Sequence, residues 1–541
     1  MFLSRIEIEN YRTFRHIVLD FNESMNYIVG DNNIGKSNFL ALLETSLSGC
    51  GFRETDFRDP ALPIHVVYTL SVGDMGKDET VSLELTQHVH EVMPVLVSRE
   101  SGETLPLEYI RRMYYIPYAL TIATQRSVGA AELADMGGVF RAYLDDEAAE
   151  RDRVEALLAD YGLSIDLSGP AESAAIHLLR AVYETDPARG SGKSTLQMML
   201  AVGTFVLSKL FKKKESRAVP FEEIVMTDER GKRYLPILIS IDEPELHLHP
   251  YMQRAVLAFL RRILNNKDPL FVHILQTVLG IDGLDGQIFV VTHSTDALIN
   301  DYRAIIRLYR NPQGEVEAAC GATFHFDKEL EKHLIMHFPE VKEALYSKCA
   351  ILVEGETEYG SFGYFAQTLG ANLDYFGICL INARGESSIV KIGQLLRRFH
   401  VPAVALYDRD VMDGRKPSPY VFYTDGLCYE MDVVETSLAR GRRELLDAVV
   451  RDGGEGGSHV SASLVKKASQ KLGLSRVQHP PRKLENISPR DMKALTFYYF
   501  AWFYGNKGVI IGRALGLHMK RDDIPPSFAR VIKAAVKIVK G

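Results

Sequence analysis

Candidate chemistry begins near the start of the chain with "GDNNIGKS", Gly30–Ser37, which satisfies the pattern G-x-x-x-x-G-K-[ST] in full. A short apolar stretch typical of a buried strand precedes it, and a stretch typical of a helix follows. In such a loop the backbone N–H groups close around phosphates, the lysine reaches the β- and γ-phosphates and the serine ligates Mg²⁺. The pattern predicts an ATP site formed by Asn33, Gly35, Lys36, Ser37 and Asn38.

Two later apolar stretches end in residues that suit the same reaction. "ILISIDEP" ends in Asp242 and Glu243; we expect the first to hold Mg²⁺ through water and the second to act as general base on the attacking water. "FVVTHS" ends in His293, whose imidazole would sense the γ-phosphate. His247 and His249 could suggest a metal site, but no third ligand is near in sequence, which favours turn and interface roles.

Together these residues resemble the ATP-binding-cassette (ABC) ATPases of the SMC, Rad50 and RecF type. The opening "IEIENYRTFRHIVLDF" matches that group, in which an N-[FY]-R segment precedes the P-loop, so Arg12 is expected to approach the nucleotide. "YYIPYAL" (Tyr114–Leu120), with Gln125 after it, is where the Q-loop region of the group would fall. The resemblance implies that a signature loop from a second subunit completes each ATP site, and therefore a homodimer or larger homo-oligomer.

A second stretch, "ARGSGKSTLQ" (Ala188–Gln197), also reads like a P-loop, so the chain could hold two of them. However, Pro187 stands where the first glycine should be, and the preceding segment is helical and polar. The alternative is the signature loop, in which small residues open a helix and direct N–H groups and a hydroxyl at phosphate. The location favours this alternative, despite a long interval before Asp242, and assigns the loop to Gly190, Ser191 and Gly192.

Acidic residues follow two apolar strands in the second half of the chain. "KCAILVEGETEYG" places Glu354 at a strand end and Glu358 on the next turn, and "VPAVALYDRD" ends in Asp408 and Asp410. Carboxylates at the carboxyl ends of parallel strands form a cation site at the usual place for an open α/β sheet. Hard oxygen ligands suit Mg²⁺ or Mn²⁺. The alternative reading is a set of exposed acids at strand ends.

The E-G-x-x-E and D-x-D strands resemble the Toprim domain of topoisomerases, primases and certain nucleases. The order of ATPase and then Toprim resembles the OLD (overcoming lysogenization defect) family over essentially the whole chain. That family includes the nuclease subunit of the Gabija antiphage system and OLD effectors of some retrons. The resemblance implies two-metal phosphodiester hydrolysis, with Glu354 as ligand and possible base and with Glu358, Asp408 and Asp410 holding the metals.

Two further site residues follow from the same resemblance. A later acidic ligand is expected, for which "CYEMDVVE" offers Glu430, Asp432 and Glu435; we favour Asp432. The family also places a lysine late in the chain, and Lys507 in "GNKGVIIGRALG" fits. Its ammonium would stabilise charge in the transition state, or, alternatively, bind a DNA phosphate from the surface.

Composition describes a multidomain globular protein. The chain has 541 residues and a net charge of −7, but from Ser461 to Gly541 there are 16 Lys/Arg against 4 Asp/Glu, which suggests a polyanion partner. Five scattered cysteines without a C-x-x-C pair fit a reducing cytoplasm, and no apolar run predicts a membrane span. The expected α/β domains are an SMC/RecF-like ABC-type ATPase at 1–340 with a helical dimerisation insert at 130–185, a Toprim core at 341–455, and a basic helical part at 456–541 that completes the nuclease site.

The sequence therefore predicts an ATP-regulated endonuclease that cuts DNA with Mg²⁺ or Mn²⁺. A role in antiphage defence, with a helicase or with a reverse transcriptase and its msDNA as accessory partner, follows from the family alone. One alternative is a Toprim nuclease that acts on RNA, including tRNA. The other is an SMC-like ATPase that recruits a partner and carries an inactive Toprim domain.

Overall fold

The computed structural model describes residues 2–72, 79–112, 114–118, 210, 220–245, 249–268, 271–272, 275–412, 418–453, 457–474 and 479–540. The candidate signature loop at Gly190–Gly192, the insert predicted at 130–185, Gln125 and His247 lie outside these residues. The chain forms two compact units, Met1–Phe324 and His325–Gly541. Within the described residues, no helix is long and apolar enough to cross a membrane.

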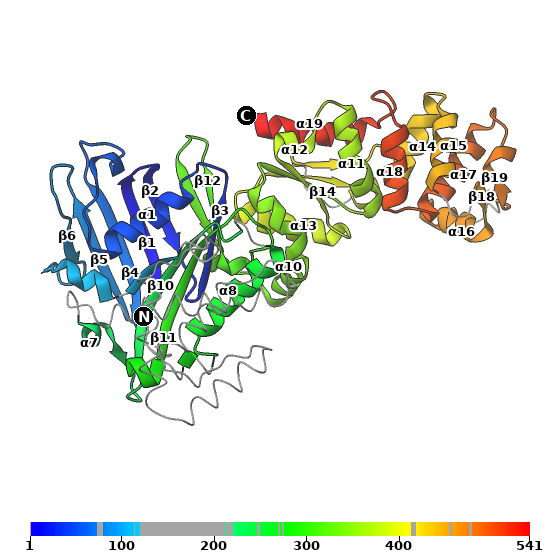
Figure 1. The fold of residues 1–541 in the computed structure, drawn as a ribbon. Helices are drawn as coiled ribbons and strands as arrows, with labels where there is room; N and C mark the ends of the chain where they lie inside the picture. Colours follow the sequence, from blue (N-terminus) through cyan, green and yellow to red (C-terminus); the bar gives the residue numbers. More distant parts are fainter. Residues whose placement is uncertain are drawn as a thin grey trace, which may run out of the picture. The chain divides into compact units, whose positions relative to one another are not determined.

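The first unit contains a six-stranded antiparallel sheet in the order β2-β1-β4-β5-β6-β7 (Figure 1). Residues alternate between its two faces: Ile6 and Ile8 are buried in the core, whereas Glu7 and Glu9 face outward. The strands are β1 (Phe2–Tyr11), β2 (Phe14–Asp20), β4 (Ile64–Val72), β5 (Glu79–Gln87), β6 (Val95–Ser98) and β7 (Thr104–Leu105).

A seven-stranded sheet carries the nucleotide motifs. Its order is β13-β12-β3-β11-β10-β8, with β9 paired to β10, and the strands from β12 to β8 are parallel. Helix α1 (Lys36–Leu47) shares one apolar core with both sheets, because Phe39 packs with Phe289 of β11 and with Phe21. The other elements are β3 (Met25–Gly30), β8 (Tyr114–Tyr118), α7 (Phe221–Ile224), β9 (Met226–Thr227), β10 (Arg233–Asp242), α8 (Pro250–Leu264), β11 (Gly283–Val291), β12 (Ile305–Arg310) and β13 (Val316–Cys320).

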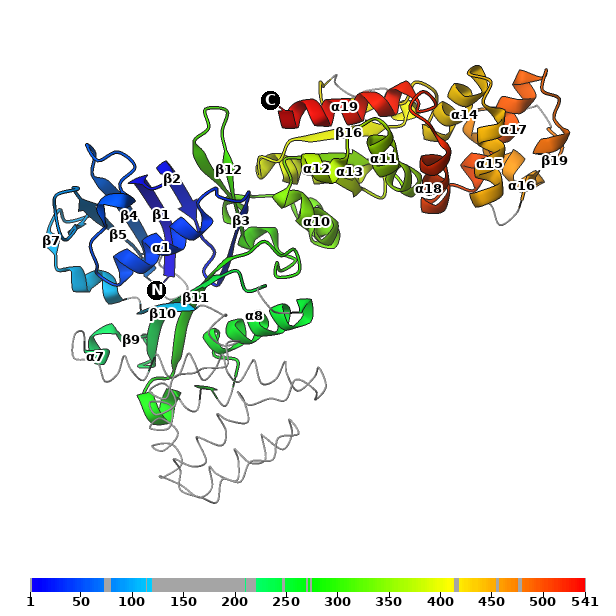
Figure 2. The ribbon, with the colours of Figure 1, turned by 45° about the horizontal axis from the view of Figure 1, so that its top comes forward.

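The second unit is built on a four-stranded parallel sheet in the order β15-β14-β16-β17. Helix α10 (Lys328–Val341) packs in this unit against α13, so the unit begins earlier than the predicted boundary at 340/341. The elements are β14 (Cys349–Val353), α11 (Glu356–Thr368), α12 (Leu373–Phe376), β15 (Ile378–Asn382), α13 (Glu386–Arg398), β16 (Ala403–Tyr407) and β17 (Val421–Tyr423). The last helix, α19 (Pro526–Lys540), returns to cover these strands (Figure 2).

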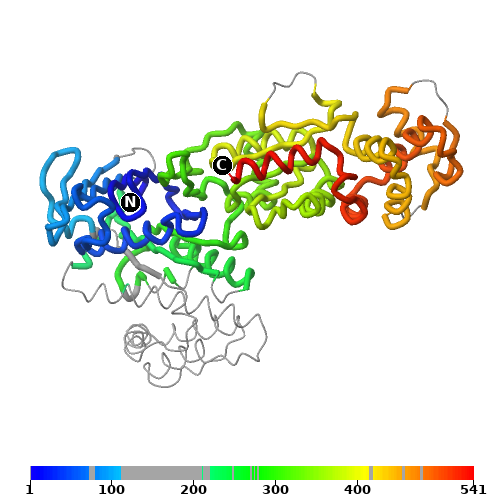
Figure 3. Tube along the Cα trace, turned by 90° about the horizontal axis from the view of Figure 1, so that it is seen from above, coloured from blue at the N-terminus to red at the C-terminus, as the bar shows by residue number. Residues whose placement is uncertain are grey.

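Between β17 and α19 the chain of the second unit forms a helical region, most of which is drawn in orange in Figure 3. Its aromatic helix α17 (Met492–Gly505) is core, because Phe497, Phe500 and Trp502 are buried. The remaining elements are α14 (Tyr429–Ala439), α15 (Arg443–Gly453), β18 (His459–Val460), α16 (Ala462–Lys471), β19 (Arg482–Lys483) and α18 (Val509–His518).

Candidate nucleotide and nuclease sites

The P-loop connects β3 to α1 through two glycines that no larger residue could replace without movement. Gly30 has φ +144°, and a Cβ there would lie 2.5 Å from the carbonyl oxygen of Leu308. Gly35 has φ +115°, and its Cβ would lie 2.4 Å from Oγ1 of Thr13. The loop is thus held close to β12 on one side and to the β1–β2 turn on the other, with α1 starting at Lys36.

The Lys36 side chain lies inside the P-loop. Its ammonium donates to the carbonyl oxygens of Gly30 (2.9 Å) and Asp31 (2.8 Å), and the residue is only 4% exposed. Burial lowers the pKa of Lys36, while Asp31 and Glu243 oppose that shift. The ammonium is therefore placed at the mouth of the loop, where phosphate oxygens could replace the two carbonyl acceptors.

The strand ends bring the other predicted ATPase residues together. Asp242 ends β10 and accepts a hydrogen bond from the Ser37 hydroxyl, which opposes the rise that desolvation causes in the pKa of Asp242. Glu243 has φ +48° and donates its N–H to Val291 of the parallel neighbour β11 (2.8 Å). Its carboxylate lies 3.7 Å from Nε2 of His293. The Glu243 carboxylate and the His293 imidazole thus lie near the Ser37–Asp242 pair.

Glu245 is a residue of this site that the sequence did not single out. Its carboxylate accepts hydrogen bonds from the backbone N–H of His293 (2.5 Å) and from the Thr292 hydroxyl (2.7 Å). The residue that ends the Asp-Glu-Pro-Glu segment therefore fixes the backbone that carries the imidazole. The sequence showed an acidic residue two positions after Glu243. It did not show that this residue binds Thr292 and His293, which follow the neighbouring strand β11.

Arg12, which the opening segment predicts to approach the nucleotide, lies beside the helix that follows the P-loop. It has φ +46°, its Nε donates to buried Asp56 (2.8 Å) and its guanidinium contacts the Asn38 side chain (3.2 Å). Asn38 in turn donates to Oγ1 of Thr13 (3.0 Å). Asn33, in the loop itself, is left-handed with φ +60°. These contacts fix Arg12 at the edge of the phosphate-binding loop.

The second site gathers carboxylates at the carboxyl end of the Toprim sheet. Glu354 follows β14, and Glu358 is in the first turn of α11. Asp408 follows β16 and accepts the backbone N–H of Tyr429 at the start of α14 (2.9 Å). Asp410 lies in the short turn after it. The four predicted ligands therefore come from two adjacent parallel strands and the turns that follow them.

Burial and mutual repulsion make this cluster hold protons. Burial raises the pKa of Glu358 to about 8, and Glu430 and Asp408 add to the shift. Burial also raises the pKa of Asp408 to about 7, again with Glu430 contributing. Like charges in a desolvated pocket disfavour ionisation unless positive charge is supplied. The cluster therefore carries more acidic groups than its own cations compensate.

Glu354 supports the same conclusion by its geometry. Its Oε2 is buried and has no hydrogen-bond partner among the residues that the structure describes, and burial, followed by Glu386 and Asp410, raises its pKa. A buried unpaired carboxylate oxygen is costly unless a ligand satisfies it. The donor set is all carboxylate, which is the chemistry that Mg²⁺ and Mn²⁺ prefer. The residues of this site thus fit divalent cations.

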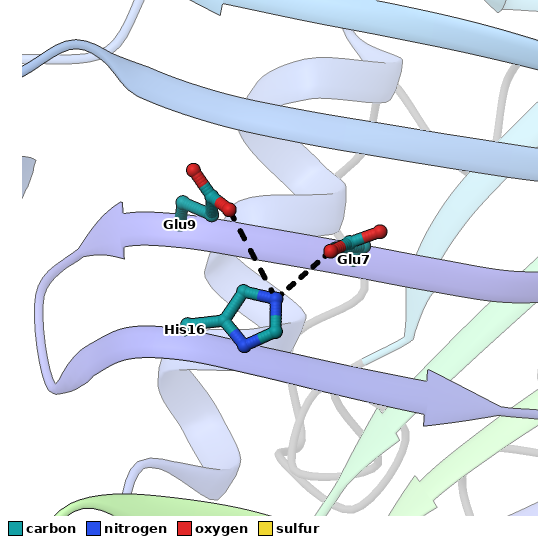
Figure 4. Close-up of side chains that lie close together, drawn as sticks. All are labelled: Glu7, Glu9 and His16. Atoms are coloured by element: carbon teal, nitrogen blue, oxygen red, sulfur yellow. Dashed lines mark hydrogen bonds and ion pairs between the residues drawn. The ribbon is translucent and has the colours of Figure 1, made fainter.

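A tighter group of potential ligands lies elsewhere, on the outer face of β1 and β2. Among the residues that the structure describes, only Glu7, Glu9 and His16 bring three such atoms within 4.8 Å of one another (Figure 4). His16 pairs with Glu7 at 2.8 Å and with Glu9 at 3.9 Å, and the His16 hydrogen bond lowers the pKa of Glu7. These cross-strand ion pairs account for the group without a metal.

The fifth predicted ligand, Asp432, has partners of its own. Its buried carboxylate accepts the backbone N–H groups of Asp425 (2.9 Å) and Gly426 and the hydroxyl of Ser527 on α19. The structure therefore places Asp432 in a contact that holds α19 to the loop before α14. Glu430, two residues earlier, lies close enough to Glu358 and Asp408 to raise the pKa of both, and its carboxylate accepts a hydrogen bond from the Cys428 thiol (3.3 Å). The choice between Glu430 and Asp432 as the later ligand depended on which face of α14 lies toward the carboxylates. The short acidic stretch in the sequence did not reveal that face.

Lys507 enters the cluster from the helical region, at the start of α18. Burial lowers the pKa of Lys507, but the charges of Glu430, Tyr504, Glu358 and Asp408 outweigh that effect and raise it, so the ammonium lies within electrostatic reach of these carboxylates. Close helix packing fixes the position. The N–H of Gly508 donates to the Thr357 hydroxyl of α11 (2.9 Å), and a Cβ on Gly512 would lie 2.1 Å from the Thr357 carbonyl.

Comparisons with known proteins agree with these two sites. Residues 345–410 match the family described as "Overcoming lysogenization defect protein-like, TOPRIM domain". Residues 1–54 match "AAA ATPase domain", and residues 229–300 match "AAA domain, putative AbiEii toxin, Type IV TA system". The three matched segments contain the P-loop, the Asp242–His293 region and the Toprim carboxylates up to Asp410.

Individual relatives resemble either the whole chain or one of its parts. Old nuclease of Escherichia phage P2 is 20% identical over 490 residues, which cover 76% of this chain and 78% of that protein. The DNA replication and repair protein RecF of Bifidobacterium adolescentis is 30% identical over 91 residues, 16% of this chain and 22% of that protein. The solved C-terminal region of the Burkholderia pseudomallei OLD protein is 15% identical and covers 36% of this chain and 99% of its own, with a TM-score of 0.23.

The chain is thus an α/β protein in which an ATPase domain precedes a Toprim domain that matches the OLD-like model, and these matches support activity as a nuclease and an ATPase.

Proposed function

We propose that this protein is an ATP-regulated endonuclease that hydrolyses DNA phosphodiester bonds with divalent cations. The observation that carries the proposal is the buried carboxylate cluster at the end of β14 and β16, in which one oxygen of Glu354 has no hydrogen-bond partner among the described residues and Lys507 lies within electrostatic reach of the acids. A vestigial Toprim domain would have no reason to keep unpaired buried acids, because such groups destabilise the fold.

Each residue of the nuclease site has a role in this proposal. Glu354, Glu358, Asp408, Asp410 and Glu430 would hold Mg²⁺ or Mn²⁺. Bound cations would supply charge neutralisation at the attacking and leaving oxygens. Glu354 would accept the proton of the attacking water, because burial raises its pKa and makes it a stronger base than an exposed carboxylate. Lys507 would stabilise the negative charge that develops on the phosphate.

The ATP site would regulate this chemistry. Lys36 and Ser37 would bind the triphosphate and its Mg²⁺, with Asp242 behind them, and Glu243 and His293 would act at the γ-phosphate. Arg12, Asn33, Gly35 and Asn38 would complete the loop. The signature loop at Gly190, Ser191 and Gly192 would come from a second copy, so a homodimer or larger oligomer is part of the proposal. ATP binding would then change the subunit geometry and with it substrate access.

Antiphage defence is the biological role that we propose, on the resemblance to the Gabija nuclease subunit and to retron OLD effectors. A helicase, or a reverse transcriptase with its msDNA, would then be an accessory partner. A cytoplasmic location is supported by five free cysteines, four of them buried.

A cleavage assay tests the function. Purified wild-type protein is incubated with plasmid, single-stranded DNA and tRNA, with Mg²⁺ or Mn²⁺ and with or without ATP. We expect plasmid nicking or cutting that requires the cation and is lost in Glu354→Ala. If the protein cleaves tRNA but neither DNA, its substrate is RNA and the proposed DNA substrate is wrong. Equal cleavage by wild type and Glu354→Ala would show that the Toprim site does not carry the activity.

A further inference from the structure

A second lysine of the helical region reaches the nuclease site. Lys471, the last residue of α16, forms a hydrogen-bonded ion pair with Asp410. Both side chains are largely covered, at 23% and 27% exposure. Lys471 also acts on Glu354, where its charge opposes the rise in pKa. The Lys471 ammonium is thus paired with the Asp410 carboxylate, which the proposed function assigns to cation binding.

An aromatic ring connects this lysine to Lys507. The ammonium of Lys471 lies 5.8 Å from the centre of the Tyr504 ring, and that of Lys507 lies 4.8 Å from the same centre. Cation–π attraction at these distances holds both charges near one ring. The helix that carries Lys471 is also fixed, because α16 approaches the end of α17 so closely that a Cβ on Gly505 would lie 2.2 Å from Leu464. The two lysines therefore form one prearranged positive edge beside the carboxylates.

The Lys471–Asp410 pair and a cation bound by Asp410 exclude one another. A divalent cation would take the carboxylate oxygens and repel the ammonium. The ammonium has a flexible stem and three donors, and Tyr504 would keep it near the site after it leaves Asp410. A phosphate is the partner that a freed lysine at the edge of a nuclease site would bind.

We propose that Lys471 is a substrate-positioning residue that occupies Asp410 until the cation binds and then binds a phosphate of the nucleic-acid strand next to the scissile bond. This rests on the proposed nuclease function for its substrate, but not for the competition at Asp410. A purely structural ion pair would stabilise the helical region without competing with a cation or binding a phosphate. The two roles therefore differ in the cation affinity that they predict when Lys471 is replaced.

The first experiment measures Mn²⁺ affinity of the full-length protein by electron paramagnetic resonance. Removing the competing ammonium in Lys471→Met should tighten Mn²⁺ binding about three- to tenfold, the range expected for loss of one partly buried ion pair. The matched control is Lys467→Met, on the same helix one turn earlier, where the lysine is exposed. Unchanged or weaker Mn²⁺ binding in Lys471→Met, or equal tightening in Lys467→Met, would overturn the competition.

The second experiment measures binding of a labelled DNA duplex at several salt concentrations, with Ca²⁺ in place of Mg²⁺ to slow cleavage. Loss of one phosphate contact in Lys471→Met should reduce the salt slope of the binding constant by about 0.7–0.9. Lys471→Arg should keep the wild-type slope, because it keeps the charge. An unchanged slope in Lys471→Met would show that Lys471 does not contact the strand. If Lys471→Met does not fold, Lys471→Gln takes its place in both measurements.

The outcomes separate this proposal from the function on which it rests. Wild-type protein that neither binds nor cuts nucleic acid would refute the proposed function, and the Mn²⁺ measurement would still decide the competition at Asp410. Wild-type cleavage together with unchanged Mn²⁺ affinity and an unchanged salt slope in Lys471→Met would refute the role of Lys471 alone.

Discussion

The ATP site and the nuclease site both lie at the carboxyl ends of parallel strands, yet they balance charge in different ways. In the ATP site Lys36 donates to two carbonyls of its own loop, and Asp242 accepts the Ser37 hydroxyl. In the nuclease site Glu358 and Asp408 repel one another and Glu430, and an oxygen of Glu354 has no hydrogen-bond partner within the described ranges. The Lys36 and Asp242 side chains of the first site thus have hydrogen-bond partners, whereas the buried carboxylates of the second repel one another.

Lys507 gives the largest expected effect on the nuclease side of this comparison. In Lys507→Met, cleavage should fall about 10²–10³-fold, the cost of removing one group that stabilises transition-state charge. ATP hydrolysis should not change, because the residue belongs to the second unit. Plasmid cleavage and phosphate release measured on the same preparation provide the test. A change in substrate KM with unchanged kcat would make Lys507 a strand-binding residue instead.

The pH dependence of cation binding follows from the raised pKa values, about 8 for Glu358 and about 7 for Asp408. Both protons must leave before the carboxylates can bind a cation, so Mn²⁺ affinity should rise on the order of 10²-fold from pH 6 to pH 8. Titration calorimetry at the two pH values would measure this rise.

The same shifts affect folding in the opposite direction. A carboxyl whose pKa is higher in the folded state binds more protons there than in the unfolded chain, so the cation-free protein should lose stability as the pH rises from about 5 to about 8. Denaturant unfolding in EDTA would show this loss, and saturating Mn²⁺ should abolish it. Stability and affinity that are both independent of pH would mean that the cluster does not hold protons.

Lys36 tests the ATP side. In Lys36→Ala the affinity for ATP should fall about 10- to 100-fold, because a charge-assisted contact with phosphate is lost. Lys193→Ala should bind ATP almost normally and at most hydrolyse it more slowly. Fluorescent-nucleotide binding distinguishes these outcomes. Loss of ATP binding in a folded Lys193→Ala protein would restore a second P-loop at Gly190–Gly192, outside the described residues.

A smaller effect separates the two acids of α14. Glu430→Gln should weaken Mn²⁺ binding about tenfold while leaving the fold intact, because the side chain faces the cluster. Asp432→Asn should instead lower the free energy of unfolding by about 1–3 kcal/mol, because its three hydrogen bonds hold α19 to the loop before α14. Denaturant unfolding and Mn²⁺ titration of both variants would decide between them. The reverse pattern would return the ligand role to Asp432.

Local patterns in the sequence predicted one site better than the other. The P-loop is contiguous, and Asp242, Glu243 and His293 end neighbouring strands, so motif and strand order together located them. The four Toprim acids were also found, since each ends or follows a strand. Glu430 was offered but Asp432 was favoured, and Lys471 was not singled out, because the positions of these residues depend on how α14 and α16 pack against α17. The pattern of apolar residues within those helices does not show which of their side chains will lie near the carboxylates of other segments.

The close packing of α11 against α18 also has a consequence in time. Glu354 and Lys507, which that packing brings together, are separated by about 150 residues, and a ribosome adds these in roughly 8–30 s. The ATPase motifs have all emerged by then, so a growing chain has every described nucleotide-binding group before it has a complete nuclease. In the proposed function, the nuclease site is therefore the last to be assembled, after every described residue of the proposed ATP site has been synthesised.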